Sequence, residues 1–299
     1  MKILIISGFL GAGKTTFIQA LAKHTKKEFV ILENEYGEVD VDSTVLKNEN
    51  MNIWELTEGC ICCSVKADFG LSILTIANTL DPDYLIVEPS GVGMLSNIFK
   101  NMKKVEYERI ELLAPITLVD YHSFHEYLTT FDAYFKDQII NAGHILLSKG
   151  EEAESSDLDN IEKSLRELNP KAEILTDHYE GQPDEWWNSL LTTAWNEEKG
   201  IYSIDTESMD MSSLSFKGIS YDHFENFQSD MGALMRGSFG QIYRVKGFLP
   251  INDQWGKLDI VNKNFSLETW EPLEESKIVI IGRNLDQKAL SILFQQKKA

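Results

Sequence analysis

The run from Gly8 to Thr16, which reads GFLGAGKTT, constrains this chain more than any other part of its sequence. An apolar, strand-like run, Ile3–Ile6, precedes it, and Thr16–Leu21 follows with the composition of a helix. Glycines at this spacing let backbone N–H groups surround phosphate oxygens, and the following helix points its positive end at them. The Lys14 ammonium would reach the β- and γ-phosphates, and the Thr15 hydroxyl would bind Mg²⁺. The sequence therefore predicts a nucleotide site that contains Gly8, Gly11, Ala12, Gly13, Lys14, Thr15 and Thr16.

Up to about residue 195, short apolar strands alternate with amphipathic helical stretches, which is typical of a mostly parallel α/β sheet. We expect strands at Lys2–Ser7, Phe29–Glu33, Tyr84–Glu88, Pro115–Asp120, His144–Ser148 and Ala172–Thr176. We expect helices at Lys14–His24, Ser64–Leu80, Phe124–Ala142, Asp157–Leu168 and Glu185–Trp195. With the glycine loop after the first strand, this order predicts a P-loop NTPase domain.

A second, smaller domain is expected because 299 residues exceed what one core usually supports. Residues 196–215 are polar and lack a clear period, so we predict the interdomain link there. Beyond it, strands are expected at Phe216–Tyr221, Gln241–Phe248, Lys257–Val261, Phe265–Glu271 and Lys277–Ile281, with helices at His223–Met235 and Leu285–Gln295. We predict a P-loop domain over 1–205 and a small α+β domain with a largely antiparallel sheet over 212–299.

The charge balance argues against nucleic acid and anionic membranes as partners. The 47 acidic and 28 basic residues give a formal net charge of -19, and the basic residues do not cluster. No apolar run approaches the ~20 residues of a membrane span. The N-terminus resembles a strand and lacks a small-residue cleavage site. We therefore expect a cytoplasmic protein.

A second phosphate element is expected at the end of the strand Tyr84–Glu88. Glu88 stands at its tip, and Gly91 follows three residues later, an arrangement similar to the acid-x-x-Gly element of GTPases. Glu88 would orient a Mg²⁺-bound or attacking water, and the Gly91 N–H would contact the γ-phosphate. The alternative is that Glu88 only ends a strand.

The base is expected to be read by the loop Ser148-Lys149-Gly150-Glu151, which occupies the place of Asn-Lys-x-Asp in GTPases. Ser148 stands for the asparagine and Glu151 for the aspartate that accepts hydrogen bonds from guanine. Lys149 would lie along the base. This loop favours GTP over ATP.

All three cysteines of the chain, Cys60, Cys62 and Cys63, lie within four consecutive residues beside a glycine. Thiolates supplemented by a carboxylate suit Zn²⁺ and related divalent ions. A redox switch and inert packing are the alternatives. The acidic stretch Glu33–Asp40 supplies nearby carboxylates, so these segments predict a transition-metal site.

Taken in order, these motifs resemble the CobW-like metallochaperone GTPases, a family of the SIMIBI class of P-loop hydrolases. The resemblance rests on GFLGAGKTT, on ENEYGE at Glu33–Glu38, on GCICC at Gly59–Cys63 and on EPSG at Glu88–Gly91. It continues at Leu118–Asp120 and into the C-terminal part at Tyr243–Phe248 and Ile278–Arg283.

The resemblance implies a GTPase whose nucleotide state controls the capture of a transition metal, Zn²⁺ or Co²⁺ first, and its release to a client protein. The implied ligands are Cys62, Cys63 and Glu38, then Cys60, with Glu33, Glu35 and His122 more distant. Client pathways in cobalamin or corrinoid maturation and in zinc allocation both fit. The motif order leaves two other functions open: an ATPase or kinase with a structural zinc, and a non-catalytic nucleotide-gated binding module. It specifies no oligomeric state.

Overall fold

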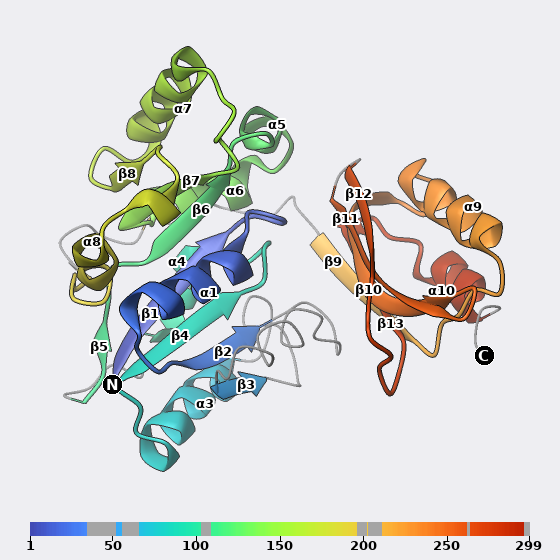
Figure 1. The fold of residues 1–299 in the computed structure, drawn as a ribbon, viewed down its shortest axis with the longest axis horizontal. Helices are drawn as coiled ribbons and strands as arrows, with labels where there is room; N and C mark the ends of the chain where they lie inside the picture. The colour runs from blue at the N-terminus through green and yellow to red at the C-terminus, as the bar shows by residue number, and fades with distance from the viewer. Residues whose placement is uncertain are drawn as a thin grey trace. The chain divides into compact units, whose positions relative to one another are not determined.

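The computed structural model describes residues 1–34, 52–55, 66–102, 109–195, 202, 211–261 and 264–295 (Figure 1). For residues 33–34, 52–55 and 66–69 only the backbone is considered. The described residues form two compact units, one within 1–202 and the other within 211–295, and each has its own sheet.

The first unit is a parallel sheet with the strand order β3-β2-β4-β1-β6-β7-β8, and β5 pairs with β1. The strands are β1 (Lys2–Gly8), β2 (Val30–Asn34), β3 (Asn52–Glu55), β4 (Tyr84–Pro89), β5 (Glu111–Leu112), β6 (Ile116–Asp120), β7 (His144–Ser148) and β8 (Glu173–Leu175). Strands β4 and β6 flank β1 and run parallel to it, so the loops after β1, β4 and β6 leave the sheet at the same edge. In open α/β sheets this edge is where ligands bind.

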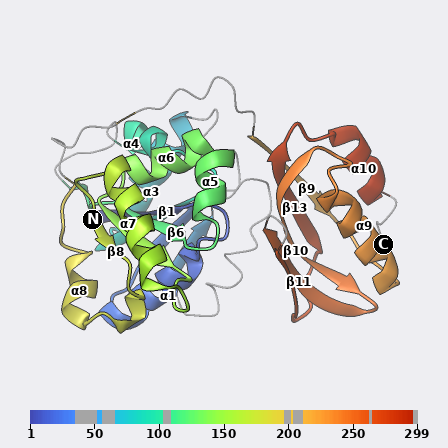
Figure 2. The ribbon, with the colours of Figure 1, turned by 90° about the horizontal axis from the view of Figure 1, so that it is seen from above.

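Helices cover both faces of this sheet, and successive residues of β1 alternate between the two cores. Leu4 and Ile6 pack with α1 (Lys14–Thr25) and α8 (Asp184–Ser189), whereas Ile3 and Ile5 pack with α3 (Lys66–Thr79) and α4 (Leu95–Met102). Figure 2 shows α4 and α6 on the side opposite α1 and α8. The remaining helices of the unit are α5 (Phe124–Thr130), α6 (Asp132–Ile140), α7 (Ser155–Leu168) and the 3-10 turn Tyr179–Gly181.

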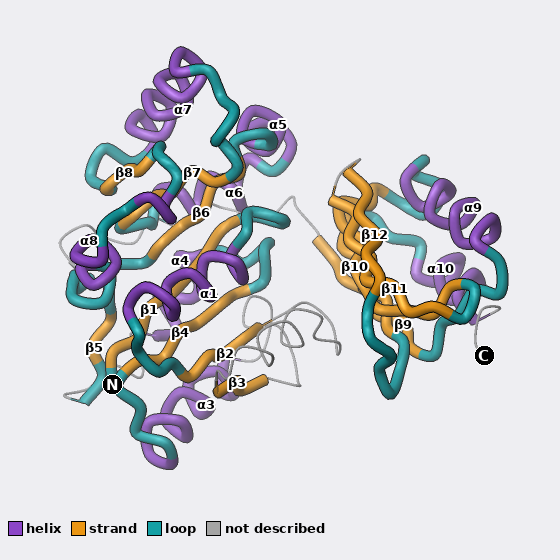
Figure 3. Tube along the Cα trace, in the orientation of Figure 1, coloured by secondary structure: helices purple, strands orange, loops and turns teal. Residues whose placement is uncertain are grey.

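The second unit is an antiparallel sheet in the order β12-β11-β10-β13-β9. Its elements are β9 (Met211–Lys217), α9 (Phe224–Met235), β10 (Gln241–Ile251), β11 (Gln254–Val261), β12 (Asn264–Thr269), β13 (Lys277–Arg283) and α10 (Gln287–Gln295). Both helices pack on one face of the sheet (Figure 3), where Phe227 and Leu290 join Val245 and Ile280 in the core.

The predicted fold class is confirmed, since a parallel P-loop-type sheet is accompanied by a small α+β unit with an antiparallel sheet. No helix of the described residues is both long and apolar enough to cross a bilayer. The predicted boundary between 205 and 212 falls almost wholly on residues that the structure does not describe.

Some predicted elements were wrong in extent. The single helix predicted over Phe124–Ala142 is two helices, because Phe131 leaves helical geometry at φ -120 and packs its ring 4.5 Å from that of Phe9. The helix predicted over Glu185–Trp195 ends at Ser189. Residues 190–192 form turns after it, and Trp195 donates its backbone N–H to the Leu112 carbonyl.

The start of the second unit also differs from the prediction. Strand β9 begins at Met211, inside the predicted link, and it ends at Lys217 because Gly218 turns the chain at φ +70. The strand predicted over Phe216–Tyr221 is therefore wrong beyond Lys217. The sequence prediction also missed β3, β5 and α4.

Candidate nucleotide-binding site

The glycine loop between β1 and α1 has the backbone that a phosphate cradle requires. Gly8, Gly11 and Gly13 have φ values of 147, 76 and 88, a range that residues with a Cβ rarely adopt. A Cβ at Gly8 would lie 2.6 Å from the Leu118 carbonyl oxygen of β6. Strand packing and loop conformation both demand glycine at this position.

The lysine of the loop is held inside it. Lys14 is 7% exposed, and its Nζ donates a hydrogen bond to the Gly8 carbonyl 3.2 Å away. Ala12 is buried, Thr15 is half-buried and Thr16 is exposed at the start of α1. The ammonium therefore lies against the loop's own backbone.

The acid-x-x-Gly element lies directly beside this loop. Glu88 is buried at the end of β4, and a Cβ at Gly91 would lie 2.9 Å from the Leu10 backbone nitrogen. Across the sheet, Glu33 of β2 is in register with both Glu88 of β4 and Glu55 of β3. Three glutamate positions thus share one level near the carboxyl edge of neighbouring strands.

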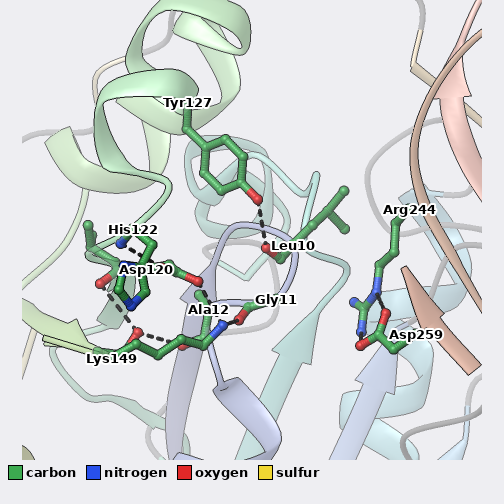
Figure 4. A network of polar contacts seen from close by, with 11 residues as sticks. Leu10, Gly11, Ala12, Asp120, His122, Tyr127, Lys149, Arg244 and Asp259 are labelled. Carbon is green, nitrogen blue, oxygen red and sulfur yellow. Dashed lines mark hydrogen bonds and ion pairs between the residues drawn. The ribbon is translucent and has the colours of Figure 1, made fainter. Parts of the chain in front are cut away.

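Two residues of the predicted base loop donate to carbonyls of the glycine loop. Ser148 Oγ lies 2.9 Å from the Ala12 oxygen, and Lys149 Nζ lies 2.7 Å from the Gly11 oxygen. Lys149 also donates to Asp120 Oδ2 at 2.7 Å, at the tip of β6 (Figure 4). These bonds hold the end of β7 and the phosphate loop as one assembly.

Glu151, predicted to accept from the base, contacts His178. Its Oε1 lies 2.9 Å from His178 Nε2, and the imidazole stacks on Tyr179. Both partners are solvent-accessible, and burial raises the pKa of the Tyr179 hydroxyl, with Glu180 and Glu151 adding to the effect. His178 follows β8, so two strand-end loops meet at this carboxylate.

The structure thus brings Lys14, Gly91, Ser148 and Lys149 to the glycine loop. The predicted metal ligands Glu35, Glu38, Cys60, Cys62 and Cys63 lie outside the described residues, and Glu33 is placed only as a backbone position in β2. Within the described ranges, no three His, Cys, Asp or Glu side chains are grouped to hold a metal. His122 is exposed in the turn after β6, where its backbone N–H donates to the Asp120 carboxylate.

Three residues of the site were not predicted as functional. Asp120 accepts from Lys149, Tyr127 Oη donates to the Leu10 carbonyl at 3.2 Å, and Gln138 donates to the Gly91 and Gly93 carbonyls. The available signal for Gln138 is an amide three residues after Phe135 on the same face of a helix. For Asp120, the available signal is an acidic residue at the end of an apolar strand.

Two family models match most of the chain. Residues 2–176 match the CobW/HypB/UreG nucleotide-binding domain, and residues 211–297 match the Cobalamin synthesis protein cobW C-terminal domain.

Curated relatives match at lower coverage. The chain is 31% identical over 49% of its length to the zinc chaperone YeiR and 30% identical over 59% to the zinc chaperone YjiA, both from Escherichia coli strain K12. The matches span 46% and 57% of those two relatives, about half of each. A zinc chaperone CobW from Pseudomonas aeruginosa is 22% identical over 97% of this chain and 90% of its own.

Among solved structures, Zn(II)-bound YjiA GTPase from E. coli aligns over 100% of this chain and 99% of its own, with 20% identity and a TM-score of 0.48. The family models alone cover more than half of the sequence and include the glycine loop. The chain therefore belongs to the CobW/HypB/UreG family of nucleotide-binding proteins and carries a CobW C-terminal domain.

Proposed function

We propose that this protein is a GTP-hydrolysing metallochaperone that binds a divalent transition metal and passes it to a client protein. The observation that carries the proposal is the assembly around the glycine loop, where Lys14, Ser148 and Lys149 all donate to carbonyls of Gly8–Ala12. Such a loop presents backbone N–H groups and one ammonium to a polyphosphate.

The triphosphate would be held by the backbone of Gly8–Gly13 and by the Lys14 ammonium. The Thr15 hydroxyl, at the start of α1, would bind Mg²⁺, which supplies charge neutralisation between the β- and γ-phosphates. The Gly91 N–H is the candidate contact to the γ-phosphate.

Hydrolysis is assigned to Glu88 as the residue that orients the attacking water. The water oxygen adds to the γ-phosphorus, the bond from this phosphorus to the β–γ bridging oxygen breaks, and the products are GDP and inorganic phosphate. Lys14 would stabilise the negative charge that develops on the bridging oxygen. Burial of Glu88 supports this role, because an acid that merely ended a strand would more readily face water.

Guanine is the proposed base because its N1–H and 2-amino groups can donate hydrogen bonds to the Glu151 carboxylate. Adenine has no donor at these two positions. Lys149 is held between Gly11 and Asp120, so its methylene chain is available to lie along the base. His178 and Tyr179 lie beside Glu151 and would border the same site.

The metal is proposed to bind at Cys60, Cys62 and Cys63 with Glu38, and Glu33 and Glu35 would supplement them. Thiolates with one carboxylate suit a tetrahedral Zn²⁺ site, and several relatives are named zinc chaperones, so Zn²⁺ is the first candidate and Co²⁺ the second. These residues lie in the sequence between Lys14 and Glu88, which are both assigned to the nucleotide. We therefore propose that metal affinity depends on the nucleotide.

The decisive experiment measures zinc affinity by competition with a chromophoric chelator in three states: with Mg²⁺ and a non-hydrolysable GTP analogue, with Mg²⁺ and GDP, and without nucleotide. We expect at least tenfold tighter binding in the first state, about 1.4 kcal/mol of coupling. Equal affinities in all three states would contradict the proposal.

Two variants separate the two sites. The double substitution Cys62→Ser and Cys63→Ser should abolish tight zinc binding and leave GDP affinity unchanged. Lys14→Ala should weaken nucleotide binding and remove the nucleotide dependence of zinc affinity, while zinc still binds. Lys23→Ala, at an exposed position of the same helix, is the matched control.

A further inference from the structure

Gln138 is a buried amide in an apolar part of helix α6. It is fully excluded from solvent, as are its neighbours Phe135 and Ile139 to within 1%. Its Nε2 donates to the Gly91 carbonyl at 3.1 Å and to the Gly93 carbonyl at 2.8 Å. Two carbonyl acceptors fix the orientation of the amide, because only the NH₂ group can donate to both. Both of its hydrogens are therefore used on one loop.

The same loop also packs against the glycine loop. A Cβ at Gly91 would lie 2.6 Å from Leu10 Cδ2 and 2.9 Å from the Leu10 nitrogen, so Gly91 already lies against Leu10. Leu10 is in turn held through its carbonyl by Tyr127 of α5. The segment Gly91–Gly93 is therefore restrained by Leu10 as well as by Gln138.

Two further hydrogen bonds anchor helix α6 at Gln138 and at the preceding residue, Asp137. The Thr117 hydroxyl of β6 donates to the main-chain carbonyl of Gln138 at 2.9 Å. The adjacent Asp137 accepts from the Ser96 N–H at 3.0 Å, at the start of α4, which directly follows the loop. Helix α6, which carries Gln138, is thus bonded both to β6 and to the start of α4, where the loop ends.

From these contacts we infer that Gln138 is a positioning residue that aims the Gly91 N–H toward the γ-phosphate. This rests on the proposed function, in which Gly91 contacts the γ-phosphate. The Gly91 N–H shares its peptide plane with the Ser90 carbonyl, which accepts a hydrogen bond from the Gly93 N–H at 2.8 Å. By holding the carbonyls of Gly91 and Gly93, Gln138 limits the movement of this turn and so pre-organises the Gly91 N–H. Gln138 then sets the preference for triphosphate over diphosphate without touching the nucleotide.

The test compares the wild-type protein with Gln138→Met, which has a similar volume and no donor. Dissociation constants for GDP and for a non-hydrolysable GTP analogue are measured with Mg²⁺ by displacement of a fluorescent nucleotide. We expect the GTP-analogue affinity to fall at least tenfold and the GDP affinity to stay within twofold. Equal losses for both nucleotides, or no loss for either, would overturn the inference.

A structural readout accompanies the affinities. The amide resonance of Gly91 in a ¹H–¹⁵N spectrum should shift when the GTP analogue replaces GDP in the wild-type protein, and this shift should shrink in Gln138→Met. A full shift in the variant would overturn the inference. Ile139→Val, at the next position of α6, controls for a loss of packing and should leave both readouts unchanged.

Two provisions keep the test decisive. If Gln138→Met does not fold, Gln138→Asn replaces it, because this variant keeps the amide on a side chain one methylene shorter. Gln138→Asn should reduce the preference for the GTP analogue by an intermediate factor. An unaltered preference counts against the inference. Failure of the proposed function would be visible separately, as a wild-type protein whose zinc affinity ignores the nucleotide.

Discussion

The hydroxyl of Ser148, the last residue of β7, donates a hydrogen bond across 2.9 Å to the main-chain carbonyl of Ala12 in the glycine loop. The same hydroxyl lies 3.3 Å from the Val119 carbonyl of β6. One small side chain therefore joins the ends of β6 and β7 to the glycine loop, so this loop depends on a residue far along the chain.

Replacement of Ser148 by alanine should weaken this junction. We expect a loss of about 1 kcal/mol in the free energy of unfolding, the usual net value of a buried hydrogen bond, and nucleotide binding several-fold weaker. Urea unfolding and displacement of a fluorescent nucleotide measure the two effects. Ser164→Ala is the matched control, because Ser164 makes a bond of equal length on an exposed helix surface. Equal losses in both variants would show that the junction is unimportant.

An alanine at Gly91 should disturb the contact between the phosphate loop and the acid-x-x-Gly element. The new Cβ would need the Leu10 backbone to move, which costs about 1–3 kcal/mol. We expect lower stability in urea and a weakened preference for a GTP analogue over GDP. Gly181→Ala should have neither effect, since a Cβ at Gly181 meets no atom within 4 Å. A variant that keeps wild-type stability and nucleotide preference would refute the close contact.

Base recognition can be tested with Glu151→Gln. The amide keeps the length of the side chain but offers a donor, which suits xanthine, because xanthine has an oxygen in place of the 2-amino group of guanine. We expect GTP affinity to fall about tenfold or more and xanthosine triphosphate to become the better competitor. Glu152→Gln, at the adjacent exposed position, controls for the loss of one charge. Unchanged base preference would mean that Glu151 does not contact the base.

The buried carboxylate of Asp137 predicts a distinctive pH dependence of stability. Burial raises the pKa of Asp137 above its ordinary 3.8, against the opposing effect of hydrogen bonds from Ser96 and Leu95. At pH values between the unfolded-state and the folded-state pKa of Asp137, the folded protein binds more protons than the unfolded chain. The contribution of Asp137 to stability therefore falls as pH rises through this range.

The measurement is the difference in free energy of unfolding between wild type and Asp137→Asn, from urea titrations between about pH 4 and pH 8. The free energy of unfolding of the wild type minus that of Asp137→Asn should decline as pH rises, and it should level off above the folded-state pKa. The total decline should be about 1.4 kcal/mol for each unit of pKa shift. Asp159→Asn, at an exposed position, controls for the loss of a carboxylate. A difference that rises with pH would contradict the predicted direction of the shift.

The loop between β1 and α1 could be predicted from the sequence because its motif is continuous. A strand, a glycine pattern, Lys14 and a helix follow one another directly. The bonds from Ser148 and Lys149 that hold this loop come from far along the chain, and the motif alone does not predict them. The parallel strands could be predicted for a similar reason, since strands covered on both faces are continuously apolar.

The remaining features depend on contacts between distant parts of the chain. The pattern of Phe124–Ala142 fits one helix, and its interruption coincides with the packing of Phe131 on Phe9. Gln138 reads as an ordinary polar residue of a helix until the structure places its amide against Gly91 and Gly93. Strand β3 was missed because only four residues form it, and pairing with β2 stabilises it.

The packing of Gly8 against the Leu118 carbonyl, together with the Ser148 bond to Ala12, bears on how this protein is made. During synthesis the glycine loop leaves the ribosome well before β6 and β7 are made. A nascent chain that ends ahead of Ile116 has the whole loop motif but none of the groups from β6 and β7 that hold it in place. Nucleotide would stabilise the completed domain by mass action, so cellular GTP and GDP would favour finished molecules over incomplete ones.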